Sequence, residues 1–282
     1  MNDSQCVAFL MWALPRLGMR WEGFRRVRRQ VCRRVRRRLG ELGLPDLSAY
    51  RGFLERNPEE WTVLDGLTHI TISRFGRDRV AFELLEREVL PALAAAVLAR
   101  GSEGVEVWSA GCAAGEEAYT LAIIWHLELA HRFPAVAIRI LATDVDETML
   151  ARGRRGCFTA GSLKELPERW LAEAFVRRDA LYCLGDTFKE AVRFVRHDIR
   201  DAPTDGPFDL VMCRNLAFTY FDLGLQRTTA ARLAGALRPA GGLVLGSHEA
   251  LPDNLDEFEP WNSTERVYRR TGARLRLAGS QE

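Results

Sequence analysis

The stretch from Val105 to Trp125, VEVWSAGCAAGEEAYTLAIIW, constrains the fold of this 282-residue chain more than any other. A short run of strand-forming residues leads into a loop of small residues, two glutamates follow, and an apolar run comes next. This order predicts a strand, a tight loop and a helix. Small residues let a ligand approach the backbone, and the first turn of a helix presents unpaired N–H groups. The pattern is therefore typical of a site for a nucleotide-like ligand.

The glycines and acids of this loop narrow the class of ligand. Gly111 and Gly115 give G-x-x-x-G without the third glycine of a dinucleotide fingerprint, and Glu116 and Glu117 would repel a pyrophosphate. An NAD-dependent dehydrogenase is therefore disfavoured. Carboxylates suit a ligand with hydroxyls or positive charge, and S-adenosylmethionine has a sulfonium, an ammonium and a ribose. An ordinary strand-to-helix connection remains the alternative, because acids are favourable at a helix N-terminus.

Polar residues also follow three further predicted strands. Asp144 ends the run AIRILATD, Asp198 ends AVRFVRHD, and Asn215 ends FDLVMCRN. Open α/β sheets bind ligands at the carboxyl ends of their strands, so we expect Glu117, Asp144, Asp198 and Asn215 to face one crevice. The alternative for Asp144 is that it caps the next helix, predicted over 147–154.

The first 90 or so residues have helical patterns only. In FRRVRRQVCRRVRRRL, Phe24 to Leu39, apolar residues recur at spacings of three and four, which predicts a helix with one apolar stripe. Nine arginines lie between Arg25 and Arg38, although the net charge of the chain is only +2. Three interpretations stay open: a solvated face, a docking surface for an acidic protein, or a contact for nucleic acid or membrane. Nucleic acid is the least favoured, because no aromatic residues are interleaved to stack on bases.

The cysteines and the apolar runs exclude several classes of protein. Six cysteines are scattered without C-x-x-C spacing, which argues against a zinc site or a disulfide framework and fits a reducing cytoplasm. No metal is implied. No apolar run approaches the roughly 20 residues of a transmembrane helix, so we expect no membrane span.

Four stretches carry a resemblance to a known family: WSAGCAAGEEAYTLA, LATDVDETMLARGRRGCF, FDLVMCRNL and LRPAGGLVLGSHE. In this order they resemble the CheR-type chemotaxis-receptor glutamate O-methyltransferases, which use S-adenosylmethionine, and the similarity extends from about Phe24 to Tyr268. The resemblance implies an α/β fold: a Rossmann-like class I methyltransferase sheet with a small all-helical N-terminal domain and a small inserted β-subdomain. We expect the helical domain and its connector at residues 1–90, the methyltransferase domain at 91–282, and the insertion at about 157–193.

By motif position, the resemblance also implies which residues contact the cofactor, S-adenosyl-L-methionine, and its product S-adenosyl-L-homocysteine. Glu117 is similar to the cofactor-binding carboxylate, Asp144 to the ribose ligand, and Arg77 to an arginine beside the methionine part. The full set is Thr71, Ser73, Arg77, Glu117, Asp144, Asp198, Ile199, Arg214 and Asn215.

Two residues are candidates for positioning the methyl acceptor. We expect Arg77 and Tyr220 to hold the acceptor carboxylate. The segment LAFTYFD after Asn215 is one residue longer than is usual in the family, so either Phe218 or Tyr220 supplies the active-site aromatic ring, and Tyr220 is favoured. A carboxylate is already ionised at neutral pH and needs no general base, so the enzyme has mainly to hold the reactants in near-attack geometry.

The expected function is methylation of glutamates on an acidic helical protein, such as a chemoreceptor, docked on the Arg25–Arg38 helix in the cytoplasm. Two alternatives remain. The connector reads TISRFGRD where the family commonly has N-x-T-x-F-F-R-D, which makes a methyltransferase acting on a small molecule or a non-receptor protein a credible alternative. The other alternative is a non-catalytic module that binds S-adenosylmethionine in signalling.

Overall fold

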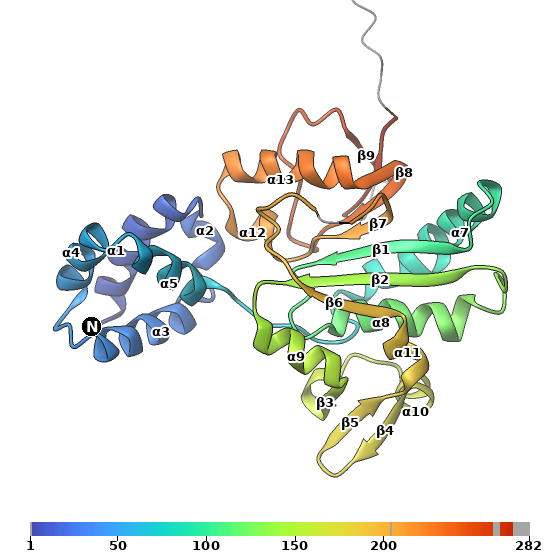
Figure 1. The fold of residues 1–282 in the computed structure, drawn as a ribbon, viewed down its shortest axis with the longest axis horizontal. Coiled ribbons are helices and arrows are strands. Elements are labelled where there is room, and N and C mark those ends of the chain that lie inside the picture. The colour runs from blue at the N-terminus through green and yellow to red at the C-terminus, as the bar shows by residue number, and fades with distance from the viewer. Residues whose placement is uncertain (1, 204, 262–265, 273–282) are drawn as a thin grey trace, which may run out of the picture. The chain divides into compact units, whose positions relative to one another are not determined.

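The computed structural model describes residues 2–203, 205–261 and 266–272, and the chain forms two compact units (Figure 1). The first unit contains Met1–Thr71 and Leu216–Gln226, and the second contains Ile72–Asn215 and Arg227–Glu282. Each unit has a hydrophobic core of its own. Residues 72–90 lie in the second unit, whereas the sequence-based boundary was placed after residue 90. That boundary stays a prediction.

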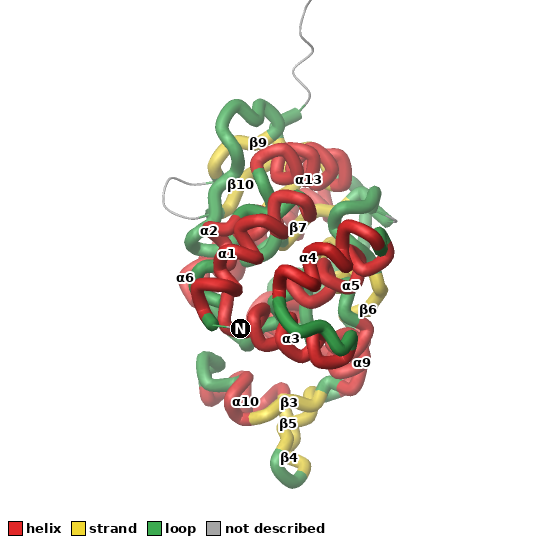
Figure 2. The backbone as a smooth tube through the Cα atoms, turned by 90° about the vertical axis from the view of Figure 1, so that its left-hand side faces the viewer, coloured by secondary structure: helices red, strands yellow, loops and turns green. Residues whose placement is uncertain are grey.

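The first unit is all-helical, as the sequence predicts, and Figure 2 shows its helices in red. Asn2 and Gln5 form a capping box at the first helix, and the Asp46 carboxylate accepts the N–H of Ala49 at the start of the fourth. The described helices are α1 Asp3–Ala13, η1 Leu14–Leu17, α2 Trp21–Phe24, α3 Arg28–Glu41, α4 Leu47–Arg56, α5 Glu59–Thr68 and α12 Ala217–Tyr220.

The basic helix α3 begins at Arg28, four residues later than the pattern predicts. Its apolar stripe is buried as expected, with Val31, Val35 and Leu39 in the core of the unit. The chain turns at Val27, whose N–H donates to the carbonyl of Phe24.

The second unit contains a seven-stranded sheet in the order β6-β2-β1-β7-β8-β10-β9. The first five strands in this order run parallel, and β10 is antiparallel to both of its neighbours, β8 and β9. The helix α8, Glu116–Ile124, follows β1 directly, so the strand, loop and helix predicted from the central stretch are confirmed. The strands are β1 Gly104–Ala110, β2 Ala137–Asp144, β6 Val192–Arg196, β7 Phe208–Met212, β8 Leu237–Val244, β9 Phe258–Pro260 and β10 Val267–Arg270.

Helices flank the sheet, which confirms the predicted α/β fold class (Figure 1). α8 and α9 pack on β2 and β6, and α7 packs on β1. All five residues of β7 are buried, as is typical of a parallel strand covered on both faces. Besides α8, the helical segments between the connector and the insertion are α6 Arg79–Leu84, the π-helix η2 Leu85–Val89, α7 Leu90–Ala99, the π-helix η3 Trp125–Leu129 and α9 Glu147–Arg155. The helix α13, Leu223–Ala236, precedes β8.

The predicted inserted β-subdomain is also confirmed. Its antiparallel sheet has the order β3-β5-β4, with β3 Cys157–Thr159, β4 Phe175–Arg178 and β5 Leu181–Leu184. The short helices η4 Ala160–Ser162, α10 Glu168–Ala174 and α11 Asp186–Glu190 accompany it. The Phe75 ring of the connector lies edge-on to Phe158 and Phe175, with ring centroids 4.8 and 5.4 Å apart. The insertion therefore packs directly against the segment that carries Arg77.

The expectation of no disulfide framework is wrong. Cys6 and Cys32 form a disulfide between α1 and α3, and Cys157 and Cys183 form one between facing residues of β3 and β5. Both pairings depend on helix packing and strand register, and neither property can be inferred from the spacing of cysteines along the chain. Cys112 and Cys213 are buried free thiols.

In the residues that the structure describes, no group of three or more His, Cys, Asp or Glu side chains could hold a metal ion. No helix in the described part of the chain is both long and apolar enough to cross a membrane.

Candidate functional site

The loop between β1 and α8 is held tightly against the neighbouring strand. The N–H groups of Gly111 and Cys112 both donate to the Thr143 carbonyl of β2, at 2.8 and 2.9 Å. Gly115 has a φ of +83°, and a Cβ at this position would lie 2.5 Å from the Phe194 ring. Only glycine satisfies both conditions. The loop therefore keeps a fixed path at the carboxyl ends of β1 and β2, where a ligand can approach the backbone.

Asp144 ends β2 and faces this loop. Its carboxylate accepts the N–H of Ala113 at 2.8 Å and that of Asp146 at 2.9 Å. The cap of α9 is Asp146, which accepts the N–H groups of Thr148 and Met149. The capping alternative for Asp144 is therefore wrong, and its carboxylate is instead oriented by the loop that follows β1.

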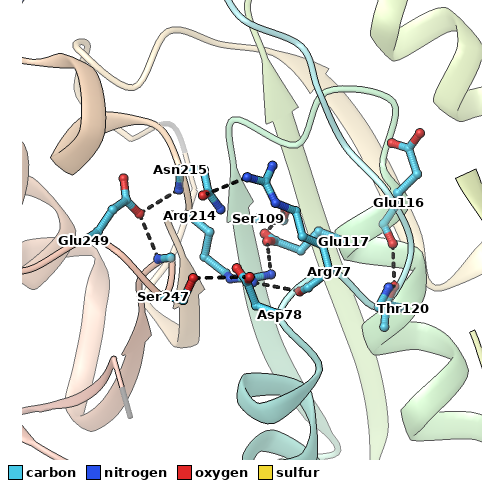
Figure 3. A network of polar contacts seen from close by, with 12 residues as sticks. Arg77, Asp78, Ser109, Glu116, Glu117, Thr120, Arg214, Asn215, Ser247 and Glu249 are labelled. Carbon is cyan, nitrogen blue, oxygen red and sulfur yellow. Dashed lines mark hydrogen bonds and ion pairs between the residues drawn. The ribbon is translucent and has the colours of Figure 1, made fainter. Parts of the chain in front are cut away.

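Arg214, which follows β7, joins two carboxylates from other elements (Figure 3). Its Nη1 donates to Oε2 of Glu117 at 2.9 Å, and its Nη2 donates to Oδ2 of Asp78 at 2.7 Å and to the Arg77 carbonyl at 2.9 Å. Glu117 also accepts a hydrogen bond from the Ser109 hydroxyl at 3.0 Å. The Arg214 side chain is only 3% exposed, so this charge is stabilised by its protein partners in place of water.

Arg77 and Asn215 meet beside this network. Nη2 of Arg77 donates to Oδ1 of Asn215 at 3.1 Å, and its Nη1 donates to the Ile72 carbonyl at 3.0 Å. The backbone N–H of Asn215 donates to the buried Glu249 carboxylate at 2.6 Å. The structure thus brings together Arg77, Arg214 and Asn215, three residues that the sequence places in one site.

The two adjacent glutamates of α8 have different environments. Glu117 is partly exposed and belongs to the Arg214 network, whereas Glu116 is 2% exposed and burial raises the pKa of its carboxyl group. The Ser73 side chain hydrogen-bonds to Glu116, which places the predicted cofactor residue Ser73 at the start of α8. The Thr120 hydroxyl donates to the Glu116 carbonyl and accepts the N–H of Gly76, so α8 also anchors the connector next to Arg77.

Asp198 and Ile199 follow β6. Arg200 binds the Asp198 carboxylate through its side chain, with Nη2 2.7 Å from Oδ2, and through its backbone N–H at 2.9 Å. Ile199 is buried. An apolar side chain next to an oriented carboxylate is compatible with an adenine ring, and the adenine-side role of this pair stays a prediction.

Two of the predicted residues, Thr71 and Tyr220, belong to the first unit. The Tyr220 ring packs against Phe24, with ring centroids 4.8 Å apart, and is partly buried. Phe218, the other candidate for the active-site aromatic, is 1% exposed. The roles of Thr71 and Tyr220 stay predictions.

Three polar residues of this arrangement are absent from the site inferred from the sequence: Asp78, Ser109 and Glu249. Asp78 follows Arg77 directly, and its Oδ1 also accepts a hydrogen bond from Ser247 at 3.2 Å. In the sequence, the feature that points to a role for Asp78 in the site is its position directly after Arg77, a predicted site residue. Glu249 lies in the stretch LRPAGGLVLGSHE, which carried the resemblance, although no role was inferred for it.

The donors and acceptors of the second unit fit S-adenosylmethionine. Carboxylates such as Glu117 and Asp144 suit positive groups and ribose hydroxyls, and a cation such as Arg77 suits the carboxylate of the amino acid part. These roles stay predictions. At Gly115 the Phe194 ring fills the space that a side chain would take, so this position needs glycine and the path of the loop is fixed. This combination defines a nucleotide-type site in a Rossmann-like methyltransferase sheet.

Comparison with known families agrees with this class. Residues 71–267 match the family model described as the CheR methyltransferase SAM-binding domain, and residues 27–64 match that of the CheR methyltransferase all-alpha domain. The chain therefore belongs to the CheR methyltransferase family. The family resemblance and the cofactor predicted from the sequence, S-adenosylmethionine, are both confirmed.

Individual relatives differ in how much of each protein is aligned. A chemotaxis protein methyltransferase of Listeria innocua is 33% identical over 190 residues, which cover 67% of this chain and 69% of the relative. One of Salmonella typhimurium is 30% identical, covering 82% and 79%. An uncharacterised 104.1 kDa protein of Rhodobacter capsulatus is 35% identical over 84% of this chain, and the match spans 25% of that protein.

Among solved structures, the glycopeptide N-methyltransferase MtfA in complex with S-adenosylmethionine is 17% identical. The match covers 55% of this chain and 48% of that one, with a TM-score of 0.33.

Proposed function

We propose that this protein is an S-adenosylmethionine-dependent methyltransferase that esterifies glutamate side chains of an acidic helical protein of the chemoreceptor type. The observation that carries the proposal is the network in which Arg214 joins Glu117 and Asp78 at the carboxyl end of the sheet, next to Arg77. Membership of the CheR methyltransferase family supports the cofactor. The names of the chemotaxis relatives support the class of acceptor.

The chain's own residues would bind and orient the reactants. S-adenosylmethionine, when bound, supplies an electrophilic methyl group on a sulfonium. Arg214 fixes the Glu117 carboxylate through a 2.9 Å bond, so this carboxylate is oriented before it meets a positive group of the ligand. Asp144, held by two backbone N–H groups, is placed to accept from ribose hydroxyls. Arg77 and Tyr220 would place the acceptor carboxylate in line, and no general base is needed.

The proposed docking surface for the acceptor is the exposed side of α3. Val31, Val35 and Leu39 hold the opposite side in the core of the first unit. Two arginines of the helix, Arg29 and Arg33, are exposed and carry charge outward. A surface of one sign attracts a partner of the other sign and speeds the encounter, most strongly at low salt.

The proposal includes the cytoplasmic location expected from the sequence. In that compartment glutathione and thioredoxin keep most cysteines reduced, so Cys6 with Cys32 and Cys157 with Cys183 would be present as thiol pairs. Thiol labelling of protein taken directly from cells, followed by mass spectrometry, tests this. Finding both pairs as disulfides would contradict a cytoplasmic location.

Calorimetric titration of S-adenosylmethionine and S-adenosylhomocysteine into the purified chain tests the cofactor site. We expect binding that is lost in Glu117→Ala and in Asp144→Ala. Glu106→Ala is the matched control, because Glu106 lies on the same strand as Ser109 but pairs with Arg139, at 2.8 Å. The control should bind as the unmodified protein does. A folded protein that binds neither ligand would contradict the proposed function.

Methyl transfer from labelled S-adenosylmethionine to purified chemoreceptor fragments tests the acceptor. A glutamate methyl ester releases its label as methanol in mild alkali, whereas an N-methyl group keeps it. Arg29→Glu with Arg33→Glu should raise KM for the fragment and reduce its salt dependence, and Arg87→Glu, an exposed arginine of η2, is the control. Binding of the cofactor without any transfer would support a non-catalytic module instead.

A further inference from the structure

The backbone at Asn215 adopts a conformation that needs support. Asn215 has a φ of +56°, in the left-handed region, at the point where the chain leaves β7. Asparagine tolerates this region better than most residues, yet the conformation persists only where the surroundings hold it. The direction of its side chain, and with it the position of Oδ1, depends on this backbone geometry.

Glu249 supplies that support from the loop after β8. Its Oε2 accepts the backbone N–H of Asn215 at 2.6 Å and that of Gly246 at 2.8 Å (Figure 3). Glu249 is 2% exposed, so both bonds are formed away from water and involve a charged acceptor, which makes them stronger than bonds between neutral groups.

Gly246 lets the three residues pack this closely. A Cβ on Gly246 would lie 2.9 Å from Oε2 of Glu249 and 3.0 Å from Cγ of Asn215. Any larger residue at position 246 must therefore displace Glu249 or Asn215. Asn215, Gly246 and Glu249 are therefore closely packed, and Asn215 accepts a hydrogen bond from Arg77 at Oδ1, at 3.1 Å.

We propose that Glu249 is a positioning residue for the cofactor site, acting through Asn215 on the guanidinium of Arg77. The inference rests on the proposed function, because it takes Arg77 as a cofactor contact. Glu249 stabilises the left-handed backbone conformation of Asn215 by accepting its N–H. This conformation sets the position of Oδ1 of Asn215, which accepts a hydrogen bond from the Arg77 guanidinium and so helps to orient it. The loop after β8 thereby determines how the connector residue Arg77 meets its ligand.

The test is the affinity for S-adenosylhomocysteine, measured by calorimetry, in Glu249→Ala and Glu249→Gln. We expect Glu249→Ala to weaken binding by about 10- to 100-fold, the range typical of partners that orient the ligands of metal sites. Glu249→Gln should recover most of the affinity, since an amide oxygen still accepts from an N–H group. Gly246→Ala should weaken binding as Glu249→Ala does, because the added Cβ displaces Glu249 or Asn215 while the Glu249 carboxylate is still present.

Asp209→Ala is the matched control for a general loss of stability. Asp209 is also 2% exposed, and its carboxylate also accepts a backbone N–H, that of Glu106 at 3.0 Å, but it lies near the amino end of β7. We expect Asp209→Ala to lower the unfolding temperature without changing affinity at a temperature where it is folded.

A double variant separates positioning from independent effects. If Glu249 acts through Asn215, then Glu249→Ala combined with Asn215→Ala binds no more weakly than Asn215→Ala alone. Additive losses, or unchanged affinity in Glu249→Ala and Gly246→Ala, would overturn the inference and leave the proposed function standing. A failure of the unmodified protein to bind the ligand would instead count against the proposed function.

Discussion

Replacing Arg214 with leucine should destabilise the second unit markedly. The Arg214 side chain is 3% exposed, and the change removes the cation that pairs with Glu117 and Asp78. Removing one member of a buried ion pair costs about 3–5 kcal/mol. The side chains of Glu117 and Asp78 are 15% and 24% exposed, so water recovers part of the loss and the lower end, about 3 kcal/mol, applies. For a domain of this size, that lowers the unfolding temperature by about 6–12 °C.

Calorimetric or fluorescence-monitored unfolding of the full chain measures this shift. Arg214→Lys should fall between the leucine variant and the unmodified protein, because one ammonium cannot reproduce the planar fork that reaches both carboxylates. Arg79→Leu is the control: its side chain is 80% exposed and pairs with Glu83 one turn away, so the change should be within about 1 kcal/mol. Equal shifts in Arg214→Leu and Arg79→Leu would refute the view that the Arg214 network is a buried, mutually dependent unit.

Three further changes test other parts of the chain. The Arg38 guanidinium, hydrogen-bonded to Glu60, holds the pKa of that carboxyl group below its ordinary value of 4.5. Ionised Glu60 therefore stabilises the protein above pH 4.5, and this stabilisation is lost as the pH falls through the folded-state pKa. In urea unfolding, the free energy of unfolding of Glu60→Gln should lack this dependence on acid pH. Gly115→Ala forces a Cβ against Phe194 and should cost about 1–3 kcal/mol in the same assay, with weaker cofactor binding. Under oxidising conditions Cys157→Ser, which removes a disulfide between residues 26 positions apart, should lower the free energy of unfolding by about 2–4 kcal/mol. Equal stability of the unmodified protein before and after reduction would contradict this.

The elements of the fold could be predicted where the sequence pattern is local. The strand, loop and helix around Gly111 and Gly115 follow from small residues between two apolar runs, and the stripe of Val31, Val35 and Leu39 follows from its spacing. The start of α3 could not be predicted in the same way. The turn at Val27 is closed by a backbone hydrogen bond to Phe24, within a stretch whose apolar spacing continues unbroken from Phe24 to Leu39.

The disulfides show a second limit of the sequence. Cys157 and Cys183 face one another only because β3 and β5 pair in one register, and a shift by one residue would turn the side chains to opposite faces. Cys6 and Cys32 meet only because α1 and α3 pack in one unit. Such distances depend on tertiary structure, and cysteine spacing along a chain contains no information about them.

The partners of the candidate site were missed for a related reason. Arg77, Arg214 and Asn215 were inferred from motifs and from the ends of strands, whereas Glu249 contributes through a hydrogen bond to the backbone of Asn215. A carboxylate that binds backbone N–H groups has no recognisable spacing to the residue it supports. Its role becomes visible only when the loop after β8 and the end of β7 are seen side by side (Figure 3).

The two adjacent glutamates at the start of α8 lie in different surroundings, one paired with an arginine and one buried. Successive residues of a helix are about 100° apart around its axis, so adjacent side chains cannot point in the same direction. Glu117 faces the Arg214 network and keeps a partner of opposite charge. Glu116 is buried next to Ser73, where burial raises the pKa of its carboxyl group, and its carbonyl connects through Thr120 to the N–H of Gly76. The Glu116 carbonyl thus helps, through Thr120, to hold the connector that carries Arg77 and Asp78, while Glu117 is joined to Asp78 through Arg214.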